Sequence, residues 1–402
     1  MDRRAAWLAV AERLLSRPTV PLVENRPAAH VFEAVQGRAN LAATRDQAGN
    51  VVVRYHGDEG DAERPLVLVA HLDHPGFAVD GREGELVTLS FRGGLAVVNA
   101  VAGSPVHFFR PGDDEAVGQG ELVGAEGDGA RLTRARARVV EGEAAVGGFA
   151  MWGFPGFALE GGRICSRACD DLLGAAVVLC TLDELSRQSP PGAEVWGLFT
   201  RAEEIGFLGT LEAMRLGTVP PGARVLSLEC SKALVDAPQG GGVIVRVGDR
   251  TSIFDPGLSE ALAQAARTLA SSDDGFRWQR KLMDAGTCEA SAFCAQGWRA
   301  SGLALPLGNY HNALDRALDG TPLDGPGIGP EHVAIDDYLA GVRLLVELAT
   351  TPELLDEPTG PPAWLAERMD RARLELDDSG SRGGSRAAGP GSEGTVAGGR
   401  RA

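Results

Sequence analysis

Apolar runs at helical and strand spacing divide the first seventy residues into one predicted helix and later strands. Residues 1–18 are apolar at helical spacing, with Glu12 and Arg13 interrupting the run, so they predict an amphipathic helix. The run PLVLVA at 65–70 is apolar throughout and leads into a polar cluster that begins with His71. This pattern is typical of a strand buried on both faces of a sheet.

The pattern changes between residues 78 and 163. Short apolar runs such as ELVTLSF, LAVVNAV and RARVV are separated at close intervals by Gly, Asp and Pro. Short strands with frequent turns indicate a small all-β unit. We expect residues 78–163 to form an inserted β-barrel domain.

Strands alternate with helices again after residue 164. This pattern predicts an α/β fold with a mixed, mostly parallel sheet covered by helices on both faces. The expected helices are 172–187, 207–217, 258–270, 289–297 and 335–355, and the expected extended segments are 194–204, 224–230, 277–286 and 299–308. Residues 1–77 and 164–375 would form one discontinuous catalytic domain. The Gly-, Ser- and Arg-rich stretch 376–402 is predicted to be a disordered tail.

Charge and cysteine content narrow the class of protein. The net charge of -16 and the absence of a Lys/Arg cluster with interleaved aromatics argue against nucleic acid as a partner. No eighteen apolar residues run together, so no membrane span is expected. Six cysteines in 402 residues form no disulfide framework and fit a reducing cytoplasm. Cys165 and Cys169 could ligate a metal, but no second pair accompanies them.

Polar residues follow five predicted strands, where open α/β sheets bind their ligands. Imidazoles and carboxylates in this number are the ligands expected of paired borderline metal ions. Each element alone has an ordinary interpretation: the Glu pair as a solvated face, Glu229 as a surface turn, His311 as a loop residue. The five places are His71 with Asp73, Asp170 with Asp171, Glu203 with Glu204, Glu229, and His311.

Taken together, these passages resemble the tetrahedral (glutamyl or deblocking) aminopeptidase family, within the clan of co-catalytic dizinc exopeptidases. The resemblance covers roughly residues 5–350. It rests on VAHLDHPGF, SRACDDLLGAAVVL, LFTRAEEIGFLGT, LSLE, DAGTCEASAF and GLALPLGNYHN. His71 and Asp170 are ninety-nine positions apart, and the inserted β-rich segment fills that interval, as in the resembled family.

The resemblance implies a role for each candidate residue. His71 and Glu229 would bind one divalent ion, and Glu204 and His311 would bind the other. Asp170 would bridge the two ions. Asp73 would accept a hydrogen bond from the second ring nitrogen of His71, and Glu203 would be the general base that activates a metal-bound water. The ions would be zinc, or else cobalt or manganese.

Departures from the family pattern leave the substrate open. His74 stands where an acidic residue is usual, Leu172 where a polar residue often follows the two aspartates, Glu229 where Asp is usual, and Gly286–Glu289 where a GTDA-like run is usual. A peptide-cleaving metallo-aminopeptidase is the favoured interpretation. An N-acyl amino acid amidohydrolase or deacylase of the same clan, and a non-catalytic scaffold with this fold, are the alternatives. The sequence does not determine the preferred side chain of the substrate.

Assembly is the last expectation. Runs such as LAVVNAV and VGGFAMWGFPGF carry more apolar surface than a small barrel can bury alone. We therefore expect a homo-oligomer, for which the resemblance suggests a twelve-subunit tetrahedron.

Overall fold

The computed structural model describes residues 2–57, 61, 63–319, 321–323, 325–355 and 363–383. The chain forms two compact units, residues 1–355 and residues 356–402. The second unit contributes one described element, helix α8 (Ala363–Gly383). All other elements belong to the first unit.

The first unit combines helices with two groups of strands. Its helices are α1 (Arg3–Leu15), α2 (Asn25–Val35), α3 (Leu172–Gln188), α4 (Leu208–Arg215), α5 (Pro256–Ser272), α6 (Glu289–Ala295) and α7 (Ile335–Ala349), with 3-10 turns η1 (Val97–Asn99), η2 (Glu203–Ile205), η3 (Tyr310–Asn312) and η4 (Pro352–Leu355). Within the described part of the chain, no helix is both long and apolar enough to cross a bilayer.

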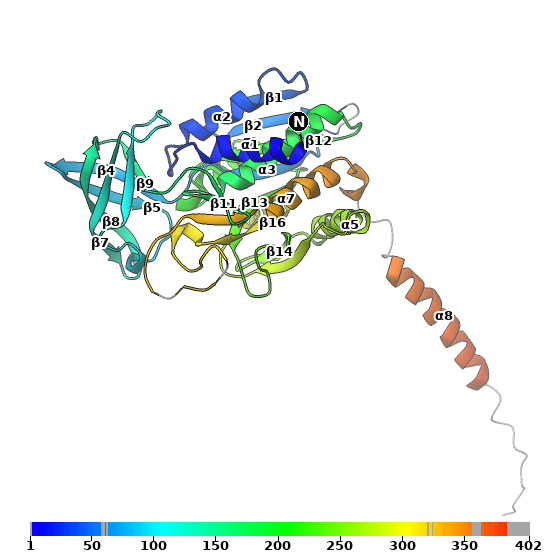
Figure 1. Ribbon diagram of the computed structural model, residues 1–402. Helices are drawn as coiled ribbons and strands as arrows, with labels where there is room; N and C mark the ends of the chain where they lie inside the picture. Colours follow the sequence, from blue (N-terminus) through cyan, green and yellow to red (C-terminus); the bar gives the residue numbers. More distant parts are fainter. Residues whose placement is uncertain are drawn as a thin grey trace, which may run out of the picture. The chain divides into compact units, whose positions relative to one another are not determined.

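An eleven-stranded mixed sheet forms the centre of this unit (Figure 1). Its main path runs β1-β2-β12-β3-β13-β16-β17-β11-β10, and β14 pairs with both β16 and β15. The four central strands β12, β3, β13 and β16 are parallel, and antiparallel strands flank them. The strands are β1 (Leu41–Arg45), β2 (Val51–His56), β3 (Leu66–His71), β10 (Ala158–Glu160), β11 (Arg163–Ser166), β12 (Glu194–Thr200), β13 (Arg224–Lys232), β14 (Val243–Asp249), β15 (Trp278–Met283), β16 (Arg299–Gly308) and β17 (Glu331–Ala334).

Helices cover both faces of the sheet, as the sequence predicts. Side chains alternate along a strand, and in β3 Leu66 and Leu68 pack into the core that includes residues of α1, α3, α5 and α7. Val67 and Val69 pack into a second core with Ala213 of α4 and residues of α6. The continuous apolar run of β3 therefore reflects burial on two sides.

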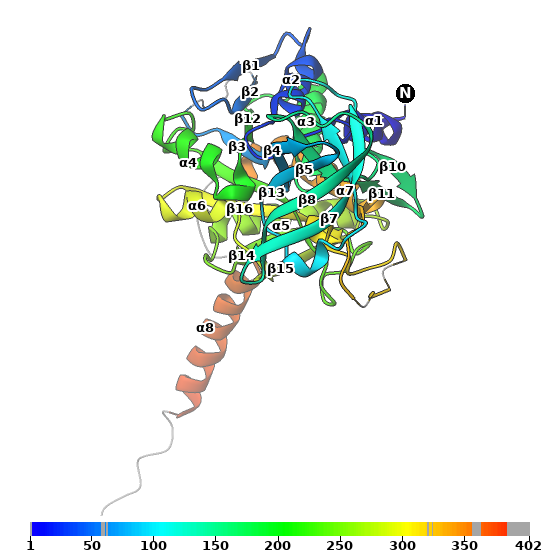
Figure 2. The same ribbon diagram turned by 90° about the vertical axis from the view of Figure 1, so that its left-hand side faces the viewer.

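A closed antiparallel barrel is inserted between β3 and β10, in the order β4-β5-β8-β7-β6-β9 (Figure 2). Its strands are β4 (Gly76–Glu83), β5 (Leu86–Arg92), β6 (Pro105–Phe109), β7 (Gly118–Asp128), β8 (Arg131–Gly142) and β9 (Phe149–Trp152). A separate apolar core fills it. β10 lies inside the predicted range 78–163 but pairs with β11 in the central sheet.

Several local expectations are wrong. Within LAVVNAV, residues Val97–Asn99 form the 3-10 turn η1 instead of a strand. The predicted closing helix ends at Ala349, and η4 follows it. Helix α8 extends to Gly383, into the predicted tail, and residues 384–402 lie outside the described residues. Phe149, Met151 and Trp152 of the second apolar run are buried within this chain, although Val98, Val140 and Val146 are exposed.

Candidate metal centre

Two histidines face one aspartate where the parallel strands end. His71 is the last residue of β3, and His311 lies in η3 after β16. Nε2 of His71 lies 3.5 Å from Oδ1 of Asp170, and Nε2 of His311 lies 3.5 Å from Oδ2 of the same residue. Asp170 therefore presents one oxygen to each imidazole.

The opposite ring nitrogens fix the orientation of both imidazoles. Nδ1 of His71 donates to the main-chain oxygen of Asp73 at 3.0 Å, and Nδ1 of His311 donates to that of Gly94 at 2.5 Å. With the proton on Nδ1, each Nε2 directs a lone pair toward Asp170, which is the usual arrangement of a metal-binding histidine. Gly94 lies just after β5, so the barrel segment supplies one of these acceptors.

Three of the predicted ligands form a compact group. His71, Asp170 and Glu204 each offer a ligand atom, and these atoms lie within 4.8 Å of one another. Glu204 Oε1 is also 3.0 Å from Nε2 of His311. Asp170 Oδ1 and Glu204 Oε1 are buried without a hydrogen-bond partner among the described residues. Buried carboxylate oxygens that face imidazole nitrogens need positive charge between them, which either a bound cation or a proton on the imidazole supplies.

The two adjacent glutamates lie on a 3-10 turn and not on an extended segment, which corrects the sequence argument for their opposite directions. β12 ends at Thr200, and Ala202 adopts a left-handed conformation (φ 52°) before η2. The carboxylate of Asp73 accepts hydrogen bonds from the main-chain amides of Glu203 at 3.0 Å and Glu204 at 3.1 Å. Its Oδ1 is 3.6 Å from Nδ1 of His71. Asp73 thus fixes the turn that carries both glutamates.

Glu203 and Glu229 complete the group of predicted residues. Glu203 Oε2 lies 3.9 Å from Nε2 of His71. Glu229 lies within β13, which continues to Lys232, and accepts a hydrogen bond from Ser227 at 3.1 Å. It also lines a cavity of about 230 Å³ together with Arg246, Lys232 and Tyr310. Tyr310 stacks on the ring of His311 at 3.8 Å between centroids.

The electrostatics of the group favour added positive charge. Burial raises the pKa of Glu203 well above its usual range, and the carboxylates of Glu204 and Glu229 raise it further, against the opposing effect of His71. Burial also raises the pKa of Glu229 to about 8. Burial alone would lower the pKa of His71 and His311, but the surrounding carboxylates outweigh it and hold both pKa values well above normal. Protons and cations therefore compete for the same site.

Two buried side chains that the sequence analysis did not assign to the site hold its segments in place. Glu331, the first residue of β17, accepts the main-chain amides of Cys169 at 2.7 Å, Asp170 at 3.0 Å and His311 at 2.8 Å. His74 joins the main-chain oxygen of Asp170 at 2.5 Å to Oδ1 of Asn312 at 3.0 Å. The sequence pointed to His74, because that residue departs from the family pattern. Nothing in the sequence pointed to Glu331, which is a single polar residue at the start of a short strand.

Known proteins share this fold. A solved aminopeptidase, APDkam598 from the archaeon Desulfurococcus kamchatkensis, superposes with a TM-score of 0.71 at 19% identity, over 90% of this chain and 99% of that one. The TET aminopeptidase of a marine sediment archaeon of the Thaumarchaeota gives a TM-score of 0.69 at 18% identity, over 87% and 99%. The TET1 peptidase of Pyrococcus horikoshii gives 0.66 at 18% identity, over 85% and 99%.

The sequence comparisons cover less of the chain than the structural ones do. The search of curated proteins gave no match. Residues 133–318 match the M42 glutamyl aminopeptidase family, a range that includes Asp170, both adjacent glutamates, Glu229 and His311. The chain is thus similar in sequence to the M42 glutamyl aminopeptidase family over residues 133–318, and it shares its fold with solved aminopeptidases.

Proposed function

We propose that this metal-dependent aminopeptidase removes N-terminal residues from peptides, with its reaction centre at Asp170. The observation that carries the proposal is the placement of Asp170 with one carboxylate oxygen toward each of two imidazoles. A carboxylate in that position can serve two cations at once. We assign His71 and Glu229 to one ion, and Glu204 and His311 to the other.

The buried oxygens without hydrogen-bond partners at Asp170 and Glu204 fit this assignment. The donor set of imidazole and carboxylate suits zinc, and also cobalt or manganese. Bound divalent ions would polarise the scissile carbonyl and lower the pKa of a water.

The role of Glu203 follows from its position. Its carboxylate lies 3.9 Å from Nε2 of His71. The compact group of ligand atoms includes Glu204 but does not include Glu203. Glu203 accepts a proton from the attacking water and delivers it to the leaving nitrogen. Burial raises the pKa of Glu203, and a carboxylate with a raised pKa is a stronger proton acceptor than an exposed one. Asp73 holds it in place through the main-chain amide.

The cavity beside Glu229 is the proposed pocket for the first side chain of the substrate. Arg246 lines it, is 3% exposed, and has two guanidinium nitrogens, Nε and Nη1, without hydrogen-bond partners among the described residues. A buried guanidinium with free donors favours a carboxylate. We therefore expect an acidic first residue to be cleaved faster than a leucyl or lysyl one.

Substrate and metal assays test this function. The metal-loaded protein should hydrolyse aminoacyl amides, lose that activity on chelation, and regain it with added zinc, cobalt or manganese. Arg246→Met should reduce the preference for glutamyl over leucyl substrates. Hydrolysis of N-acetyl amino acids in place of free-amine substrates would instead support the amidohydrolase alternative. Metal binding without turnover of either class would support the scaffold.

We also propose that this chain assembles into a homo-oligomer. One solved neighbour is described as a dodecamer, and the Pyrococcus horikoshii TET1 peptidase as assembling into a tetrahedron or an octahedral shell. Val98, Val140 and Val146 leave apolar surface exposed on this barrel segment. We extend the homo-oligomeric state to this chain, with twelve subunits as the expected number.

A further inference from the structure

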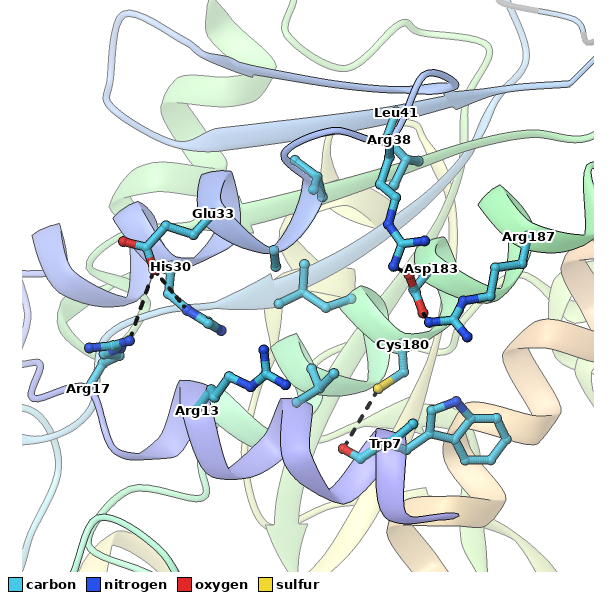
Figure 3. Close-up of a pocket in the computed structure, with 15 residues that line it drawn as sticks. Trp7, Arg13, Arg17, His30, Glu33, Arg38, Leu41, Cys180, Asp183 and Arg187 are labelled. Carbon is cyan, nitrogen blue, oxygen red and sulfur yellow. Dashed lines mark hydrogen bonds and ion pairs between the residues drawn. The ribbon is translucent and has the colours of Figure 1, made fainter. Parts of the chain in front are cut away.

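A cavity of about 290 Å³ lies between α1, α2 and α3, away from the metal centre (Figure 3). Its inner wall is apolar and includes Val10, Leu179 and Cys180. α3 begins directly after Asp171. Cys180 lies nine residues after Asp171, so this part of the wall is roughly 14 Å from Asp171 at a rise of about 1.5 Å per residue. The cavity is therefore separate from the proposed substrate pocket.

Arginines dominate the rim of this cavity. Arg13, Arg17, Arg38 and Arg187 line it together with two acidic residues, Glu33 and Asp183, so the lining carries two more positive than negative charges. The whole chain carries a net charge of -16. A locally cationic pocket in an acidic protein attracts anions, because the local field acts within a Debye length.

Three of the four arginines have acidic partners. Arg38 and Arg187 share the single carboxylate of Asp183, the latter at 2.6 Å. Arg17 pairs with Asp114 at 2.5 Å and lies 4.0 Å from Glu33.

Arg13 differs from the other three. Its guanidinium has no ion pair or hydrogen bond with any described residue, and Figure 3 shows it directed between α1 and α2 into the cavity.

His30 lines the same cavity as the arginines. His30 is buried beside Glu33, with Nδ1 3.3 Å from its carboxylate. Burial lowers the pKa of His30, and the positive charges of Arg17 and Arg13 lower it further, although Glu33 opposes them. His30 is thus neutral near pH 7 and can present its ring as part of the wall. The positive charge of the cavity then belongs to the arginines.

We propose that this cavity binds a small amphipathic carboxylate, with the carboxylate on Arg13 and an apolar body against Val10, Leu179 and Cys180. A guanidinium can bind a carboxylate through two parallel hydrogen bonds. The volume lies at the lower end of ligand pockets, so it suits a body the size of one branched or aromatic side chain. Inorganic phosphate is a poorer fit, because it has no apolar part and carries more charge than one unpaired arginine balances.

Calorimetric titration of the full-length, metal-loaded protein tests the proposal. 4-Methylpentanoate should bind, and inorganic phosphate should bind more weakly. Arg13→Gln should weaken 4-methylpentanoate binding by at least about tenfold, since it removes a charge-assisted pair. Ala34→Leu places extra atoms at an exposed position in the cavity lining, and it should weaken binding as well. Arg136→Gln, at an exposed site on β8, is the matched control and should bind like the unmodified chain.

The source of the carboxylate is distinguished by titrating leucine. Binding of leucine at least as tight as that of 4-methylpentanoate would assign the site to free amino acids, with Glu33 or Asp183 near the ammonium group. Weaker binding of leucine would assign it to carboxylic acids. Absence of 4-methylpentanoate binding up to its solubility would overturn the proposal. Equal binding to the Arg13→Gln and Ala34→Leu variants would also overturn it, because the ligand would then occupy another site such as the metal centre.

Discussion

The carboxylate of Glu331 accepts the main-chain amide of His311 at 2.8 Å, and its other oxygen accepts the amide of Asp170. One buried side chain thus joins two ligand-bearing segments that are far apart in the sequence. Glu331→Gln replaces one acceptor oxygen with an amide that would face another donor. We expect metal affinity to fall by about 10- to 100-fold, as for other residues that orient ligands. Competition with a chromogenic chelator measures it, and the exposed Glu126→Gln should match the unmodified protein.

The adjacent glutamates should separate into a catalytic and a binding defect. Glu203→Gln keeps the shape of the side chain but removes the proton acceptor, so turnover should fall by roughly 10²- to 10⁴-fold with metal content unchanged. Glu204→Gln should mainly lower metal content. Steady-state kinetics with metal analysis of each variant checks both. If Glu203→Gln loses metal and Glu204→Gln keeps it, the two roles are exchanged, and full activity of Glu203→Gln would refute the mechanism.

Chelation should lower stability as well as activity. The carboxylates around Asp170 would then repel one another, and the binding energy of the ions would be lost. For one site, the loss is about 2.7 kcal/mol when free metal is about 100 times the dissociation constant. Differential scanning calorimetry should show a lower melting temperature after chelation. Asp170→Ala should be the most damaging ligand change, and an unchanged melting temperature in all cases would exclude a structural metal.

Acid stability should depend on His332. Burial lowers the pKa of His332 from 6.5 to about 4, and the positive charge of Arg163 adds to this effect. The unfolded chain therefore binds this proton more tightly than the folded one. The stabilising contribution is complete above pH 6.5 and is lost as the pH falls toward about 4.

His332→Asn should flatten the dependence of unfolding free energy on pH between 6.5 and 4 relative to the unmodified protein. Urea titrations at saturating metal concentration measure it. Parallel curves for the two proteins would show that His332 does not titrate as described.

Light scattering tests assembly. A homo-oligomer should persist at micromolar concentration, because exposed apolar side chains such as Val98 and Val140 favour contact with another copy. A chain that ends at residue 383 should give the same number of subunits. A monomeric mass would contradict the proposed assembly.

The sequence predicts the central sheet well because each buried strand is an apolar run that stops at a polar cluster. Helix α2 escapes prediction, since Pro27, His30 and Glu33 interrupt its apolar pattern. The turn at Glu203 also escapes, because Ala202 takes a left-handed conformation that alanine rarely adopts. Glu24 offsets that cost by accepting the amide of Ala202 at 3.1 Å while it pairs with Arg201. Such long-range contacts leave no local pattern.

The inserted barrel segment is not structurally independent of the metal centre. Because Nδ1 of His311 donates to the main-chain oxygen of Gly94, the insertion carries part of the support for a residue on the other side of the site. Excising the segment between β3 and β10 and closing the gap with a short linker would remove the hydrogen-bond acceptor of that imidazole nitrogen. Exchange of whole barrels between relatives would succeed only where the incoming loop presents a carbonyl at the same point. A change in the insertion near Gly94 therefore also changes the support of His311 in the reaction centre.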